Sequence, residues 1–117
     1  MKDNIVKEKS LAFSVRIVNL HRYLTQEKRE FIISKQIYKS GTSIGANIAE
    51  AQRAQSTADF VAKMKIALKE ANETQYWLQL LHQTQYLTDR EFESIHGDAV
   101  EILKLLTAIC KHYPQAR

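Results

Sequence analysis

The sequence predicts an all-α protein, an antiparallel up-down four-helix bundle, on three observations. The 117 residues include one proline and three glycines, too few for a turn-rich β sandwich or a glycine-loop nucleotide fold. Apolar residues recur at steps of three and four along four long segments, the spacing of one helix face. The connections between these segments are short, which places consecutive helices antiparallel. The length suits a single domain over residues 1–117.

The first predicted helix covers about residues 5–24. Its apolar stripe is Val6, Phe13, Ile17, Leu20 and Leu24. Thr25, followed by Gln26 and Glu27, predicts a break in the helix and an immediate restart.

The second predicted helix covers about residues 28–54. Two glycines, Gly41 and Gly45, interrupt it, and each lowers helix stability by about 1 kcal/mol relative to alanine. The spacing continues on both sides of them, so we expect an unbroken helix in which the glycines mark the close approach of another helix. Its stripe is Ile33, Ile37, Ser40, Ile44, Ile48 and Ala51.

The third predicted helix covers about residues 57–83. Ser56, with Asp59 three residues later, has the pattern of an N-terminal cap. The stripe that follows is the most regular in the chain: Phe60, Met64, Ala67, Ala71, Thr74, Leu78 and Leu81.

The fourth predicted helix covers about residues 89–112. Thr88 and Glu91 have the spacing of a capping box, and Leu87 and Phe92 that of a hydrophobic staple. Pro114 ends the helix because proline cannot continue it. The stripe is Phe92, Ile95, Ala99, Ile102, Leu106, Ile109 and Tyr113.

Cysteine content and hydropathy predict a cytoplasmic protein with no membrane partner. The single cysteine, Cys110, cannot form an internal disulfide, which fits a reducing compartment. No apolar run approaches the length of a membrane span, and the N-terminus lacks the apolar region of a signal peptide.

The enzyme classes that use helical bundles do not fit the sequence. A di-metal carboxylate centre needs two Glu-x-x-His motifs, and the chain has only one, Glu93 to His96. Cys110 and His112 are two residues apart on a helix, so they do not face each other. We therefore expect a non-enzymatic protein with no metal and no cofactor.

A row of polar residues on the second predicted helix runs beside its apolar stripe. It has two interpretations: a structural network that fixes the packing or assembly of helices, or a ligand or nucleic-acid role for Asn47 or Glu50. The row comprises Gln36, Ser40, Ser43, Asn47 and Glu50.

The third predicted helix carries a tryptophan beside acidic residues. Glu70, Glu73 and Trp77 lie along one face, flanking the apolar stripe. A large indole in this position is either an interface anchor or a side chain that widens the core of the monomer.

Basic residues are concentrated in the first half of the chain. The net charge is +4 overall, and residues 1–58 alone carry +5. Such a distribution suggests an anionic partner, although a solvated charged face has the same pattern. Lys28, Lys35 and Lys39 are expected on one helical face, where they could neutralise phosphates. The phosphate-contact candidates are Lys28, Lys35, Lys39 and Arg53, and the further basic residues are Lys7, Lys9, Arg16, Arg22 and Arg29.

Two separated motifs resemble a known protein family. The motifs are the stretches 40–51, SGTSIGANIAEA, and 66–78, IALKEANETQYWL. Together they resemble the bacterial four-helix-bundle family named after proteins encoded in intervening sequences of 23S ribosomal RNA genes. The resemblance extends from about residue 10 to residue 112. The residues that match the motifs include Ser43, Asn47, Ile48, Glu50, Glu73 and Leu78.

The resemblance implies a small bundle that assembles into a homopentamer and has no known catalytic site. It also implies similarity to the accessory protein of diversity-generating retroelements, a pentameric barrel that binds a reverse transcriptase and nucleic acid. This chain departs from many relatives at Gly45, where they have proline, and at Ala51, where they have glycine. It also has fewer basic residues than many relatives, with Tyr38-Lys39 where they often have paired arginines.

The leading hypothesis is a non-catalytic, homo-oligomeric bundle that binds RNA or DNA as an accessory protein. The rival hypothesis is a protein-binding scaffold with no nucleic-acid role, for which a reverse transcriptase-like protein is one candidate partner. A di-metal enzyme is the third class and predicts bound iron or manganese.

Overall fold

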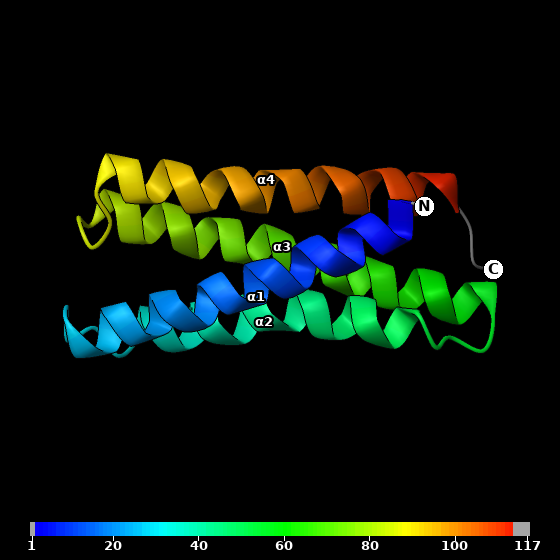
Figure 1. Ribbon diagram of the computed structural model, residues 1–117, viewed down its shortest axis with the longest axis horizontal. Coiled ribbons are helices and arrows are strands. Elements are labelled where there is room, and N and C mark those ends of the chain that lie inside the picture. Colours follow the sequence, from blue (N-terminus) through cyan, green and yellow to red (C-terminus); the bar gives the residue numbers. More distant parts are fainter. Residues whose placement is uncertain (1, 114–117) are drawn as a thin grey trace.

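Four helices form an elongated bundle in the computed structural model, which describes residues 2–113 (Figure 1). They are α1 (Lys2–Gln26), α2 (Ile33–Ala51), α3 (Thr57–Gln83) and α4 (Asp89–His112). Each helix packs against its neighbour in the chain, and α1 also packs against α4. The bundle measures 44 × 22 × 20 Å. The prediction of an all-α, up-down four-helix bundle is therefore confirmed.

The predicted apolar stripes meet in one core. All five stripe residues of the first helix are buried, and Ile37, Ile44 and Ile48 of α2 are at most 1% exposed. Phe60 and Phe92, at the starts of α3 and α4, pack against the core while remaining partly exposed. Tyr113, expected to end the fourth stripe, is 38% exposed and lies just beyond α4.

Both predicted helix caps are present. The Asp59 amide donates to Ser56 Oγ over 3.0 Å, so α3 begins where the sequence places it. At α4 the Glu91 amide donates to Thr88 Oγ1 over 3.1 Å, and the Thr88 amide donates to Glu91 Oε1 over 2.8 Å. The observed bounds of α3 and α4 equal the predicted ones because their signals are local hydrogen bonds.

The predicted start of the second helix at residue 28 is wrong, because residues 27–32 form a loop. Arg29 has φ of 57°, in the left-handed region that a helix does not use. The Glu30 carboxylate then receives the amides of Ile32, Ile33 and Ser34 at 3.1, 2.9 and 2.7 Å. Three otherwise unpaired donors are satisfied in this way, so α2 begins at Ile33.

The predicted end of the second helix at residue 54 is also wrong, because α2 ends at Ala51. The Gln52 amide still donates to the carbonyl oxygen of Ile48, four residues earlier, as in an α-helix. The Arg53 amide instead donates to the carbonyl oxygen of Glu50, three residues earlier, so the chain tightens into a turn. Arg53 therefore lies in the α2–α3 connection.

Gly41 and Gly45 lie where α1 and α2 approach most closely, as expected. A Cβ added to Gly41 would lie 2.7 Å from Ile17 Cγ1, and one added to Gly45 would lie 3.3 Å from the Ser10 carbonyl oxygen. A side chain at Gly41 would require the Ile17 side chain to move, and one at Gly45 would require small shifts of Ser14 and Ser10. The helix runs through both glycines without interruption.

None of the helices described here is both long enough and apolar enough to cross a membrane.

Candidate functional site

The predicted basic stripe is only partly on one helix. Lys35 and Lys39 are exposed side chains one turn apart on α2, and at this spacing they share a face. Lys28 lies in the α1–α2 loop. Its Nζ is 5.7 Å from the centre of the Tyr23 ring, close enough for a cation–π contact. The structure thus keeps the three lysines at one end of the bundle but not on one helical face.

Arg53 lies apart from these lysines. It follows the C-terminus of α2, and about 24 Å of helix separate Lys35 from that end. In Figure 1 the α1–α2 loop and the end of α2 are at opposite ends of the bundle. The four phosphate-contact candidates therefore do not form one cluster.

Arg22 and Arg29 join the three lysines at the α1–α2 end. Both are exposed, and the Arg29 guanidinium carbon is 5.3 Å from the centre of the Phe31 ring. Within residues 5–113, no carboxylate forms a salt bridge with any of the five basic residues. We call this set the basic end: Arg22, Lys28, Arg29, Lys35 and Lys39.

The polar row of α2 is mostly a surface feature. Gln36 and Glu50 are exposed, whereas Ser43 and Asn47 are half-buried. Asn47 Nδ2 donates to the Ser43 carbonyl oxygen over 2.9 Å, so it is satisfied within its own helix. Glu50 Oε1 forms an ion pair with Lys63 Nζ of α3, and the two atoms are 3.1 Å apart. Asn47 and Glu50 are thus paired within the monomer, and of the five residues of the row only Ser40 is buried.

The buried polar contact of the core lies between α2 and α3. Ser40 and Thr74 are at most 1% exposed, and their hydroxyl oxygens are 3.0 Å apart. Thr74 also donates to the Glu70 carbonyl oxygen over 2.8 Å. The sequence places both residues in apolar stripes, but nothing in it indicates that they pair.

Trp77 is partly buried against the core. Its Nε1 donates to Glu73 Oε2 over 3.2 Å, and its ring meets that of Tyr76 edge-on at 5.1 Å. The contact with the core supports the interpretation that Trp77 widens the monomer core. The role of an interface anchor stays a prediction.

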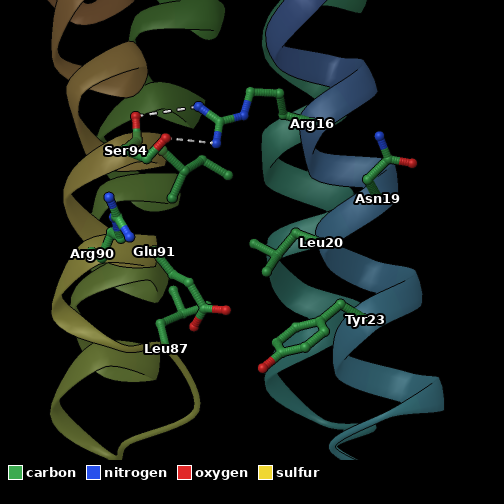
Figure 2. A pocket seen from close by; sticks show the side chains of 9 residues that line it. Arg16, Asn19, Leu20, Tyr23, Leu87, Arg90, Glu91 and Ser94 are labelled. Atoms are coloured by element: carbon green, nitrogen blue, oxygen red, sulfur yellow. Dashed lines mark hydrogen bonds between the residues drawn. The ribbon is translucent and has the colours of Figure 1, made fainter.

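A cleft of about 560 Å³ separates the C-terminal half of α1 from the start of α4. Figure 2 shows Leu20 and Tyr23 on one side of it, opposite Leu87 and Glu91. The sequence offers no signal for this cleft, because Glu91 reads as a capping residue and Tyr23 as a position beside the core stripe. The lining residues are Arg16, Asn19, Leu20, Tyr23, Leu87, Arg90, Glu91, Ser94 and Ile95.

Arg16 closes one end of the cleft. Its guanidinium donates to Asp98 Oδ2 over 2.8 Å, to Ser94 Oγ over 3.0 Å and to the Ser94 carbonyl oxygen over 3.2 Å. Figure 2 shows the two Ser94 contacts crossing from α1 to α4. A planar guanidinium with three such bonds holds one orientation, so Arg16 ties the two helices together above the cleft.

Exposed apolar side chains lie on two separate helices. On α1, Leu11 is 68% and Val15 is 55% exposed. They are one turn apart and therefore share a face, and Leu11 also lines a groove of about 310 Å³ between α1 and α2. On α3, Ile66 and Tyr76 are 42% and 58% exposed. Leu11 and Val15 are therefore adjacent on the surface, whereas Ile66 and Tyr76 are about 15 Å apart along α3.

The residues tested for catalytic chemistry are not brought together. His96 stacks on Phe92 with ring centres 4.7 Å apart, while Glu93 is exposed. Burial raises the pKa of the Cys110 thiol, and the charge of Lys65 opposes part of that rise. Over the part of the chain that the structure describes, no three His, Cys, Asp or Glu side chains gather closely enough to hold a metal ion.

Comparison with known proteins places this fold in a family. The sequence profile described as 23S rRNA-intervening sequence protein matches residues 2–108. A crystal structure from Bacteroides thetaiotaomicron, described as a protein of unknown function from the S23 ribosomal protein family, is 63% identical in sequence. The similarity covers 95% of this chain and 99% of that one, with a TM-score of 0.93. No match is found among curated proteins. The chain belongs to the 23S rRNA-intervening sequence protein family.

Proposed function

We propose that the protein is a non-catalytic, homo-oligomeric bundle that binds RNA through its basic end and acts as an accessory protein. The observation that carries the proposal is the gathering of five exposed basic residues at one end of the bundle. Lys9, Arg16 and Lys63 form salt bridges with carboxylates of neighbouring helices. The residues of the basic end form none within residues 5–113, so their charges are available to phosphate groups.

A homo-oligomer is supported by exposed apolar side chains on two helices. Leu11 and Val15 share a face of α1, whereas Ile66 and Tyr76 are exposed at two separate points along α3. These helices are diagonal in the bundle, because each packs against α2 and α4 and not against the other. Contact between two different faces of successive copies generates a ring when the rotation closes. The pentamer is the ring size that the family resemblance implies.

The RNA-binding proposal is tested with single-stranded RNA over a series of salt concentrations. Replacing Lys35 and Lys39 by glutamine (Lys35→Gln, Lys39→Gln) removes two phosphate contacts. We expect the slope of log affinity against log salt to flatten by about 1.4 units, because each contact on a single strand contributes about 0.7.

The matched control removes two exposed charges from α4, with Lys104→Gln and Lys111→Gln. This variant has the same net charge as the test variant, and its slope is expected to equal that of the wild type. Binding without salt dependence, or no binding at low salt, contradicts the proposal. Equal flattening in both variants would show that only net charge matters and would also contradict it.

The assembly proposal is tested by light scattering of the purified protein. We expect an oligomer at micromolar concentration, and dissociation when Leu11→Glu and Val15→Glu place charges on the α1 face. Thr107→Glu, at an exposed polar position on α4, should leave the assembly intact. A wild-type monomer would contradict the proposal.

A protein-binding scaffold is the second candidate, and one observation favours it. Phe31 and Ile32, beside the basic end, are 53% and 77% exposed, which is unusual for adjacent large apolar residues. Under this alternative a stoichiometric protein partner, of which a reverse transcriptase-like protein is one candidate, survives nuclease treatment and is lost with Ile32→Ser. Loss of the partner on nuclease treatment favours the RNA-binding proposal.

A further inference from the structure

We propose that the cleft between α1 and α4 binds one unpaired guanine base of a single-stranded RNA. This inference rests on the proposed RNA-binding function and names the part of the RNA that the protein recognises. The cleft is open to solvent along its length, and its volume of about 560 Å³ is within the range of known ligand sites. Its lining combines apolar surfaces, an aromatic ring, a carboxylate and basic side chains.

The apolar part of the cleft suits the flat faces of a base. Leu20 and Leu87 are largely buried and form part of the lining. The half-buried Tyr23 ring stands at the wider end, with its hydroxyl directed toward the α4 side in Figure 2. Unpaired bases are commonly held by stacking on aromatic side chains, because every base has a π face.

The Glu91 carboxylate accounts for the choice of base. Glu91 Oε1 accepts from the Thr88 amide over 2.8 Å, which fixes the side chain, and Figure 2 shows the carboxylate extending toward α1. Among the residues described, nothing donates a hydrogen bond to Oε2. An ionised carboxylate has about four acceptor sites, and those that Thr88 does not use face solvent, where a ligand can reach them.

Guanine is the base whose edge matches a carboxylate. Its N1–H and N2–H donors lie side by side and can meet the two carboxylate oxygens together, which gives a charge-assisted pair of hydrogen bonds. Adenine and cytosine present one amino group beside a ring acceptor, and uracil presents one N–H between two carbonyls. Each of these three bases would direct at least one acceptor at the negative charge of Glu91.

Basic side chains stand where the attached phosphates would lie. Lys28 Nζ is 5.7 Å from the centre of the Tyr23 ring, and Arg90 lines the cleft from α4. Neither forms a salt bridge within residues 5–113. The cleft thereby continues the basic end, so one strand can contact both.

The dimensions favour a nucleotide over a peptide helix or a duplex. The lining of α1 runs from residue 16 to residue 23, about 10 Å along the helix axis, and Arg16 closes one end of it. A docked amphipathic helix needs anchors at i, i+3, i+4 and i+7 along an open groove. In a duplex the guanine edge that meets Glu91 is already paired, so the site requires a single strand.

The experiment measures the binding of short uridine oligonucleotides that carry one central guanosine, inosine or adenosine. Inosine lacks only the N2 amino group. We expect the guanosine oligonucleotide to bind about tenfold more tightly than the inosine one, because a hydrogen bond to a charged group is lost. The complementary duplex and guanosine monophosphate serve as competitors, and both are expected to compete weakly.

The decisive variant is Glu91→Gln. Glutamine also serves as the third residue of a capping box, so α4 keeps its N-terminus while the charged acceptor is lost. We expect the preference for guanosine over inosine and adenosine to fall to within about twofold.

Tyr23→Leu tests the stacking surface independently. We expect about tenfold weaker binding of the guanosine oligonucleotide. Tyr113→Leu is the control, because Tyr113 is an exposed tyrosine beyond the C-terminus of α4 and so lies at the opposite end of that helix. The helix content of both variants is measured by circular dichroism. If Tyr23→Leu fails to fold, Glu91→Gln still tests guanine recognition, because Glu91 is an exposed residue.

The outcomes separate this inference from the proposed function. Salt-dependent RNA binding with no preference for guanosine, or a preference that survives Glu91→Gln, overturns the guanine cleft and leaves the basic end as the RNA site. Competition by guanosine monophosphate or by the duplex as strong as that by the strand overturns the assignment to single-stranded RNA. No RNA binding at low salt overturns both proposals.

Discussion

The two sides of α1 differ in how closely they pack. Against α2, Gly41 and Gly45 bring the helices so close that a single added Cβ would clash with Ile17 or approach the backbone of Ser10. Against α4, the same helix is held by Arg16 and then separates to leave the cleft of Figure 2. Figure 1 shows α1 crossing the bundle obliquely, running from α4 toward α2.

This difference shows how residue size distributes open space in a small bundle. Gly41 and Gly45 of α2 allow α1 to pack closely on that side, and the seam with α4 stays open although large side chains line it. Interiors are otherwise packed to crystal-like density. An open seam beside a tightly packed one is therefore a place where a ligand can bind without unfolding the protein.

The largest expected effect comes from filling the tight seam. Gly41→Ala gains helix propensity but drives its Cβ to within 2.7 Å of Ile17, a fully buried side chain. We expect the free energy of unfolding to fall by about 1–3 kcal/mol, the usual effect of overpacking a core. Urea denaturation followed by circular dichroism measures it.

Gly97→Ala is the matched control for that variant. Gly97 is also inside a helix, but a Cβ there would meet nothing within 4 Å. We expect stabilisation by up to about 1 kcal/mol, since only the propensity gain remains. If Gly41→Ala proves as stable as Gly97→Ala, the seam is not tight in solution.

A smaller effect is expected where α2 begins. Glu30→Ala removes the acceptor of three backbone amides, and we expect a loss of about 1 kcal/mol in the free energy of unfolding, the typical cost of a lost helix cap. Glu27→Ala changes an exposed acid in the same loop and should have little effect on thermal unfolding. A similar loss in both variants would contradict the capping role.

The smallest effect is expected in the open seam. A double-mutant cycle with Arg16→Ala and Asp98→Ala should give a coupling energy below about 1 kcal/mol, because both side chains are substantially exposed. The same cycle on Lys9 and Glu101, which form a single contact of 3.2 Å, should give less. A coupling of several kcal/mol would mean that Arg16 holds the seam as firmly as the glycines hold the other.

The fold could be predicted almost completely from the sequence, because its signals are periodic or local. Stripes at steps of three and four identify the buried faces. The starts of α3 and α4 are indicated by Ser56, Thr88 and Glu91, which form short-range capping hydrogen bonds. The α1–α2 loop cannot be predicted in this way, because its signal is neither periodic nor evident in local helix propensity. Lys28, Arg29 and Glu30 favour helices intrinsically, and the loop depends on a buried carboxylate folded back onto the following amides.

The site could be predicted only in part. Charge counting identifies the lysines of the basic end, but the separation of Arg53 depends on where α2 lies in space. The cleft depends on the oblique course of α1 and on contacts such as that from Arg16 to Asp98, 82 residues apart in the chain. Neither carries a signal in local sequence.

The most direct test of RNA binding at the basic end is photo-crosslinking of the native protein to a short RNA, followed by peptide mapping. We expect crosslinked peptides to come from the end of α1, the α1–α2 loop and the start of α2, with Tyr23 among the modified residues. Crosslinks confined to α3 or to the α2–α3 connection around Arg53 would contradict this account.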